Sequence, residues 1–305
     1  MKKLSVKEKK RILFYTSVVA FPVLQFIVFY IVVNLQSILF AFQSYDGVSK
    51  FDFVWFDNFK EVFKCFATEQ KLSYAWKNSL VLYFFTLVVG TGGAIFFSNY
   101  IYKKNFGHKL FQVVLFLPHI ISGVVLMTVY KFLLDQGIPQ LGKALGVKIL
   151  PLLDNYDDHF KLVLIFQLWM GFGTQVLMYT STMSGISSAV VESAQLDGIT
   201  PFKELIFITL PMIYPTFVTF ITVGVAGLFT NQMSLYNFYG NNVNPKAYTL
   251  GYYLFRETQV ASSIIPPDVS KYPKISALGL IFTLIAVPIT FVVKWAMEKL
   301  GPSVD

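Results

Sequence analysis

Charged residues are scarce in this sequence. Asp, Glu, Lys and Arg make up only 14% of its 305 residues, whereas a soluble globular domain carries about 25%. Hydrophobic residues make up 55%, and 32 of the residues are phenylalanine. The shortage of charge excludes an ordinary soluble protein and indicates a chain that lies in a membrane.

Cysteine and histidine are also rare. The single cysteine, Cys65, excludes an internal disulfide, and its surroundings (KEVFKCFATE) predict an ordinary helix residue. No Ser-His-Asp, Cys-His or paired-carboxylate set can be assembled at one membrane depth, so we do not expect an enzyme. The carboxylates beside His159 in NYDDHF (155–160) predict a solvated loop without a metal, because adjacent residues on an extended loop do not converge on one ion.

The net charge of +8 is not arranged in a stripe that could follow a nucleic acid. We therefore expect the excess of Lys and Arg to set the orientation of the chain in the membrane and to contact anionic lipid, and we expect no nucleic-acid partner.

Long runs without charge predict an all-α membrane protein with six transmembrane helices, since a helix needs about 20 apolar residues to cross the hydrocarbon. The runs are 12–45, 78–102, 110–130, 162–191, 205–245 and 275–293. The expected helices lie near 12–35, 78–99, 111–133, 162–184, 206–230 and 275–297. No strand pattern is apparent. The first run is longer than the apolar region of a signal peptide and lacks a cleavage site, so we expect a retained helix.

The positive residues predict the orientation. Six of them precede the first helix within residues 1–11, and Lys103, Lys104 and Lys109 occupy the second short loop without an acid. The longer loops on the other side carry acids such as Asp52 and Asp154. Both termini and the 100–110 loop are therefore expected in the cytoplasm, and residues 12–305 are expected to form a single transmembrane domain.

Two further patterns are weak. GIPQLGKA (137–144) has the glycine and lysine spacing of a phosphate-binding loop, but Ala144 replaces the Ser or Thr that reaches Mg²⁺, and no strand precedes it. We therefore expect the chain to bind no ATP and no other cofactor. His119 follows Pro118 near the end of the third helix, and its role stays open between a proton-carrying group and a helix-end residue.

The stretch VVESAQLDGITPFKELIFITLP (190–211) interrupts the apolar sequence with polar residues. Ser187 and Ser188 can cap a short helix, and Gly198 can end it in the left-handed conformation. Thr200 and Pro201 then suit the start of the next helix. A plain connection between antiparallel helices needs only about 2–8 residues, so the coupling segment (residues 187–206) is more elaborate than a linker requires.

The stretch resembles the EAA signature of permease subunits of binding-protein-dependent ABC importers. That signature is Glu-Ala-Ala, three residues, Gly, nine residues and Ile-x-Leu-Pro. Here Glu192, Ser193 and Ala194 are followed by Gly198 and by ITLP at 208–211, with Ser193 as the one departure. The resemblance extends over about residues 50–297, with a conserved part of about 75–297. FVWFDNFKEVF, WKNSL, LFLPHIISGVV, LWMGFG, AYTLGYYLFRE and KISALG are similar to the carbohydrate branch, and specifically to the first-named subunit of maltose- and oligosaccharide-type pairs. The large external insertion and extra N-terminal helices of some maltose permeases are absent.

This resemblance implies a permease subunit of a sugar importer in a bacterial cell membrane. The implied partners are a second homologous permease, two ATP-binding subunits that hold ATP and Mg²⁺, an external solute-binding protein, and the lipid bilayer. The residues implied to couple the chain to the ATPase are Glu192, Ser193, Ala194, Asp197 and Gly198.

Helical spacing and the resemblance agree on a substrate face. On the fourth helix this face contains Gln167, Gly171, Thr174, Gln175 and Met178, with Met170 at its border. On the fifth helix, helical spacing adds Gly224, Leu228 and Asn231, with Gln232 next. On the third helix, Ser122 follows the Pro118 break. Leu228 departs from the polar residue expected for maltose. The alternative is that these small and polar residues make helix–helix contacts.

Two alternatives for the function remain at this stage. The chain could be a permease for another solute, such as glycerol phosphate or a peptide-like compound. It could also be a stand-alone channel or secondary carrier, which would place ionisable residues in mid-membrane. The charge-free runs disfavour the second alternative.

Overall fold

The computed structural model describes residues 5–45, 51–263 and 268–302. Its contacts divide the chain into two compact units. Unit 1 combines the chain up to Ala67 with Glu257–Ile281, and unit 2 combines Thr68–Arg256 with the chain from Phe282 onward. Each unit is described by itself. Helices make up nearly all of both units, as the sequence predicted.

Unit 1 begins with a long helical run. It consists of α1 (Val6–Phe26), the π-helix η1 (Ile27–Val32) and α2 (Val33–Phe40). The Ser5 hydroxyl accepts a hydrogen bond from Glu8 N, and the Glu8 carboxylate accepts one from Ser5 N, which together form a capping box. The apolar window of Lys7–Phe40 is unburied within the chain and is long enough to cross a membrane.

A short hairpin follows in unit 1 and corrects the expectation of no strands. Strand β1 (Gln43–Tyr45) pairs antiparallel with β2 (Phe51–Phe53). Asn58 of α3 (Asp57–Thr68) supports it by donating hydrogen bonds to the carbonyl oxygens of Ala41 and Gln43, at 2.9 and 2.7 Å. Three-residue strands are too short to show a twofold repeat in sequence. Cys65 lies within α3, as predicted.

The remainder of unit 1 comes from the later part of the chain. It contains the end of α15 (Leu250–Ser263), the short helix η8 (Val269–Lys271) and the beginning of α16 (Tyr272–Leu300).

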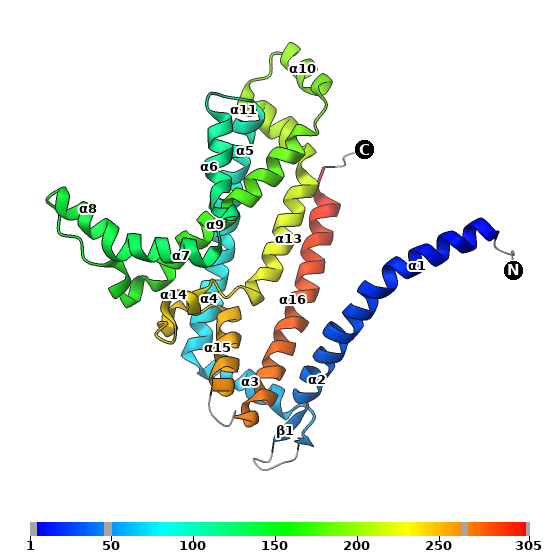
Figure 1. Cartoon of the computed structure of the whole chain (residues 1–305), viewed down its shortest axis with the longest axis vertical. Helices are drawn as coiled ribbons and strands as arrows, with labels where there is room; N and C mark the ends of the chain where they lie inside the picture. The colour runs from blue at the N-terminus through cyan, green and yellow to red at the C-terminus, as the bar shows by residue number, and fades with distance from the viewer. Residues whose placement is uncertain (1–4, 46–50, 264–267, 303–305) are drawn as a thin grey trace. The chain divides into compact units, whose positions relative to one another are not determined.

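Unit 2 is a helical bundle built around α9 (His159–Ser184) (Figure 1). Its other long helical run consists of α4 (Gln70–Phe85), the π-helix η2 (Thr86–Thr91) and α5 (Gly92–Tyr102). The core side chains Tyr179 and Met183 are fully buried beside Ile95 and Ile213. The Ser98 hydroxyl donates a hydrogen bond of 2.9 Å to the carbonyl of Val176 and joins α5 to α9.

Helix α6 (His108–Ile120) packs against α9 at very short range. A Cβ at Gly173 would lie 2.3 Å from the Leu115 carbonyl oxygen, so this crossing requires glycine. Small residues permit such close approach between membrane helices.

Two of the expected spans are broken. Helix α6 ends at Ile120. The next helical run lies at 102° to it and consists of α7 (Gly123–Phe132), η3 (Leu133–Gly137) and α8 (Ile138–Ala144). This corrects the expectation of one helix over 111–133. Pro118 removes a hydrogen bond from the last turn of α6, and Ile121 is extended. The segment 137–144, weighed as a phosphate-binding loop, is helical.

The second broken span is the expected helix 206–230. Helix α11 (Pro201–Glu204), the π-helix η6 (Leu205–Thr209) and α12 (Leu210–Met212) form its first part, and α13 (Tyr214–Thr230) follows at 70°. Pro215 in the first turn of α13 favours a new helix start there. Four unbroken helices and the two bent pairs give up to six membrane spans among the described residues, in line with the predicted number.

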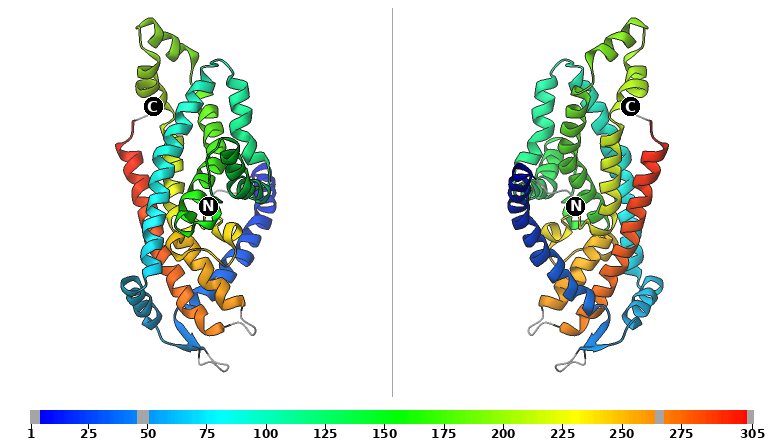
Figure 2. Two further views of the ribbon diagram at one scale, coloured as in Figure 1. Left: turned by 90° about the vertical axis from the view of Figure 1, so that its left-hand side faces the viewer. Right: turned by 90° about the vertical axis from the view of Figure 1, so that its right-hand side faces the viewer.

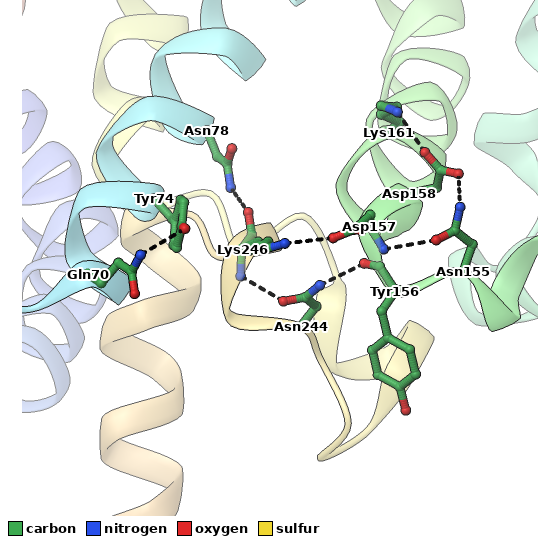
Figure 3. Close-up of polar contacts among 10 residues, drawn as sticks. All are labelled: Gln70, Tyr74, Asn78, Asn155, Tyr156, Asp157, Asp158, Lys161, Asn244 and Lys246. Atoms are coloured by element: carbon green, nitrogen blue, oxygen red, sulfur yellow. Dashed lines mark hydrogen bonds and ion pairs between the residues drawn. The ribbon is translucent and has the colours of Figure 1, made fainter.

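Several loops are joined at the end of unit 2 that holds α14 (Leu235–Tyr239) and the beginning of α15 (Figure 3). The short helices η4 (Leu152–Asp154) and η5 (Tyr156–Asp158) precede α9, and η7 (Pro245–Ala247) precedes α15. Lys246 forms an ion pair of 2.9 Å with Asp157, and Asn78 of α4 donates to the Lys246 carbonyl at 2.7 Å. The Asp157 carboxylate raises the pKa of Lys246 by hydrogen bonding and by charge attraction. Both charged side chains are exposed, so the ion pair adds little to the free energy of folding, and its main effect is to orient the two loops.

We expect Gly173→Ala to destabilise unit 2 at the α6–α9 crossing. Overpacking typically costs about 1–3 kcal/mol, and here the obstacle is backbone, which cannot rotate away. Gly171→Ala on the same helix is the matched control, since its Cβ would meet nothing within 4 Å. Thermal unfolding of the purified protein in detergent should show a lower Tm for Gly173→Ala only. Equal Tm values for the two variants would contradict the crossing.

Candidate substrate pathway and coupling segment

The coupling segment lies at one end of unit 2, the same end as the turn between α5 and α6 (Figures 1 and 2). Its helix is α10 (Ser188–Leu196). Ser187 is the N-cap residue, as predicted, with the extended backbone of a cap. Its side chain makes no capping hydrogen bond to α10, so the cap differs from the expected one in that respect.

Helix α10 ends in a Schellman motif centred on Gly198. The Gly198 N–H donates to the Gln195 carbonyl at 3.0 Å, and the Ile199 N–H donates to the Ala194 carbonyl at 3.2 Å. Gly198 has φ +76°, which confirms the predicted left-handed conformation. Thr200 is the N-cap residue of α11 and Pro201 lies in its first turn, as predicted, but the Thr200 side chain makes no capping hydrogen bond; its carbonyl accepts from Glu204 N at 2.8 Å.

The coupling segment exposes apolar side chains on both sides of Gly198. Leu196 is 89% exposed and Phe202 is 71% exposed. Glu192, Ser193 and Asp197 are exposed as well, while Ala194 is partly covered. Exposed large apolar groups rimmed by polar ones are typical of a protein contact surface.

A buried ion pair attaches the coupling segment to the bundle. Glu204, at the end of α11, accepts a hydrogen bond from the Lys103 ammonium at the end of α5, and their side chains are 4% and 24% exposed. From the sequence, Lys103 pointed only to membrane topology, and Glu204 carried no prediction. The sequence feature that could have drawn attention to Glu204 is its position as a carboxylate immediately before the apolar run that begins at Leu205.

The predicted face of α9 divides into an uncovered and a covered part. Gly171 and Met178 are exposed, and Gln167 and Thr174 are partly exposed, on the side opposite the buried core residues. Gln175 belongs to the packing instead, because its carboxamide oxygen accepts a hydrogen bond of 3.2 Å from Thr91.

Helix α6 contributes to the uncovered face through His119. The His119 Nδ1 lies 3.1 Å from the Thr174 hydroxyl. The two residues are 55 positions apart in the sequence, which gave no sign that they meet. Their contact makes His119 a hydrogen-bonding partner on the same surface, close to the break after Ile120.

The break itself brings Ser122 and Met170 to the same region. Ser122 is exposed and caps α7 through its carbonyl, which accepts from Leu126 N at 3.0 Å. A Cβ at the adjacent Gly123 would lie 3.8 Å from the Met170 methyl group. The Pro118 break therefore places Ser122 next to Gly123, near Met170 at the border of the α9 face.

The α13 candidates differ in their surroundings. A Cβ at Gly224 would lie 3.0 Å from the Tyr83 ring of α4, which is the helix–helix contact that the alternative interpretation expects. Leu228 is partly buried. Asn231 follows the end of α13, and its carboxamide oxygen accepts from Met233 N at 2.7 Å.

Gln167 and Asn231 meet in a pocket, here called the amide pocket. Seven further residues line it: Thr230, Gln232, Met233, Ser234, Tyr236, Asn237 and Phe255. Met233 and Ser234 adopt φ +51° and +53°, a conformation that costs a non-glycine residue about 1–2 kcal/mol. Apart from Gln167, Asn231 and Gln232, these residues were missed by the sequence analysis, because they gather only through the fold of 230–256.

Comparison with known proteins supports the resemblance. Residues 90–305 match the family described as binding-protein-dependent transport system inner membrane component. The multiple sugar-binding transport system permease protein MsmF of Streptococcus mutans is 26% identical over 78% of this chain and 83% of its own length. The galactooligosaccharides transport system permease protein GanP of Bacillus subtilis is 26% identical over 74% of this chain and 57% of its own length.

A solved structure shares the fold. A chain of the bacterial alginate ABC transporter in complex with alginate pentasaccharide-bound periplasmic protein superposes with a TM-score of 0.79, covers 98% of both chains and is 19% identical. The family match covers more than half of the sequence and is consistent with the helical bundle and its broken spans. The chain therefore belongs to the family of inner membrane components of binding-protein-dependent transport systems.

Proposed function

We propose that this chain is one of two permease subunits of an ATP-driven importer of sugars or oligosaccharides. The observation that carries the proposal is the exposed and partly exposed face of α9 that contains Gln167, Gly171 and Thr174, in the middle of a helix long and apolar enough to cross a membrane. Polar groups on a membrane helix are costly against lipid, so this face favours a water-filled pathway completed by a second subunit. The sugar-permease relatives support this substrate class.

The coupling segment would connect this pathway to ATP hydrolysis. Its exposed Leu196 and Phe202 would dock on a cytoplasmic ATPase, which holds ATP and Mg²⁺ in our proposal. The Schellman motif at Gly198 fixes the turn in the middle of the segment, and the Lys103–Glu204 pair holds its C-terminal end. A stiff element can transmit the closure of the ATPases to α13 as a rigid-body movement, which is one route to alternating access.

The proposed assembly contains a second permease, two ATPase subunits and a solute-binding protein on the opposite side of the membrane. We place both termini and the coupling segment in the cytoplasm from the positive residues of the first segment and the α5–α6 turn.

Cysteine labelling tests this orientation. In a Cys65→Ser background, Phe106→Cys should react with a membrane-impermeant thiol reagent only after the cells are opened, because Phe106 is 96% exposed in the α5–α6 turn. Lys148→Cys, exposed between α8 and α9, is the matched control and should react in intact cells. Labelling of Phe106→Cys in intact cells would reverse the proposed topology.

Replacing Gly198 tests both coupling and the proposed function. Gly198→Val forces a β-branched residue into φ +76° at a cost of about 1–2 kcal/mol, whereas Gly198→Asn tolerates that conformation. No neighbour lies within 4 Å of the added Cβ, so the strain is confined to the backbone. In the complex reconstituted with its binding protein, Gly198→Val should lower sugar uptake and sugar-stimulated ATP hydrolysis together, and Gly198→Asn should retain most of both.

Two results would count against these ideas. Wild-type levels for Gly198→Val would show that Gly198 is a turn residue without a coupling role. A wild-type complex whose ATP hydrolysis no sugar-loaded binding protein stimulates would contradict the sugar importer itself.

Removing one member of the Lys103–Glu204 pair should also impair coupling. Glu204→Gln leaves the Lys103 ammonium partly buried without its counter-charge, which we expect to cost about 1–3 kcal/mol because Lys103 retains some solvent contact. Tm and stimulated ATP hydrolysis should both fall. The double variant Lys103→Met, Glu204→Gln should recover part of the loss. Additive losses in this double-mutant cycle would indicate that the two side chains do not interact.

A further inference from the structure

The lining of the amide pocket is polar but carries no charge. Gln167, Asn231, Gln232 and Asn237 contribute four carboxamides, and Ser234 adds a hydroxyl. A carboxamide has both a hydrogen-bond acceptor and two N–H donors; the Asn231 oxygen already accepts from Met233 N, so Asn231 offers chiefly its donors. A sugar hydroxyl is likewise both donor and acceptor, so this lining can bind several hydroxyls of one ring.

The pocket also has an apolar wall. The rings of Tyr236 and Phe255 lie edge to face with their centroids 5.7 Å apart. Ligand pockets commonly combine an apolar surface with a few placed polar groups. Here the aromatic pair can cover the C–H face of a sugar while the carboxamides bind its hydroxyls.

The backbone around the pocket is held in place before any ligand binds. Met233 is fully buried and strained together with Ser234, and the Thr249 hydroxyl donates a hydrogen bond of 2.7 Å to the Asn231 carbonyl. A Cβ at Gly251 would lie 2.5 Å from the Thr230 carbonyl, so the start of α15 rests directly on the end of α13. Strained and tightly supported backbone of this kind is concentrated at binding sites, and a preformed pocket loses less entropy on binding.

The absence of charged side chains from the lining restricts the class of ligand that the pocket can bind. The nearest cation in sequence, Arg256, is not among the lining residues, and its guanidinium donates a hydrogen bond of 2.8 Å to Asn241. A carboxylate that entered the pocket would lose water without gaining a positive partner from the lining, which is unfavourable. An uncharged sugar meets no such penalty.

We propose that the amide pocket is a subsite for a neutral saccharide and that it discriminates against uronic acids. This inference rests on the proposed function and narrows its substrate class. The fold itself does not impose the choice, because a solved transporter with a TM-score of 0.79 to this chain is described as importing the acidic polysaccharide alginate. The selectivity would reside in the side chains of residues 167 and 230–255.

Saturation-transfer NMR on the complete importer in lipid nanodiscs, without its binding protein, tests the proposal. The probes are neutral gluco-, galacto-, xylo- and chito-trisaccharides, with trigalacturonate and trimannuronate as acidic counterparts. At least one neutral probe should bind, and the uronates should not. The double variant Gln232→Ala, Asn237→Ala should weaken that binding at least about tenfold, which corresponds to about 1.4 kcal/mol of lost hydrogen bonding.

The control is Gln136→Ala, an exposed glutamine outside the pocket, which should bind the neutral probe as the wild type does. The variant Asn237→Lys adds a cation to the lining and should allow a uronate to bind. Uronate binding to the wild type that the double variant abolishes would overturn the proposal. So would the absence of any neutral probe whose binding depends on Gln232 and Asn237. An importer whose ATP hydrolysis is stimulated by a uronate-loaded binding protein would keep the proposed sugar import and lose only this inference.

Discussion

The close crossing of α6 and α9 at Gly173 is the constraint on which the rest of unit 2 depends. Because a side chain at this position would collide with the Leu115 carbonyl, the two backbones fix the rotation of α9 about its axis. That rotation buries Tyr179 and Met183 in the core. It leaves Gln167, Gly171 and Thr174 on the face that this chain does not cover, so the packing of one side of α9 determines the chemistry of the other.

Backbone outside the regular helices is stabilised by different interactions at the two ends of unit 2. At the coupling end, the carbonyls of α10 are satisfied by the Schellman motif, and Glu204 is neutralised by Lys103. At the opposite end, side-chain amides replace backbone partners, as Asn78 and Asn231 show. The coupling segment and the amide pocket therefore both lie where regular helices stop.

The sequence by itself determined the helical class, the number of spans and the local stops. Low charge and run length sufficed for the spans, because lipid imposes a fixed thickness on every crossing. The places of Gly198, Thr200 and Pro201 at helix ends could be predicted because they depend on the backbone conformations that each residue type itself favours. Helical periodicity and the family resemblance together predicted the α9 face, although periodicity did not separate exposed Gly171 from Gln175, which accepts a hydrogen bond from Thr91.

Only the tertiary structure decided which residues meet. The Lys103–Glu204 pair joins residues 101 positions apart, and Asn78 reaches a carbonyl 168 positions away. The contact of Gly224 with Tyr83 and that of His119 with Thr174 are of the same kind. The sequence indicated a break at Pro118 but not its angle of 102°, and it did not predict the bend of 70° before α13, because hydropathy carries no signal for either angle. Local propensity and periodicity describe one segment at a time, whereas these contacts depend on how separate helices pack.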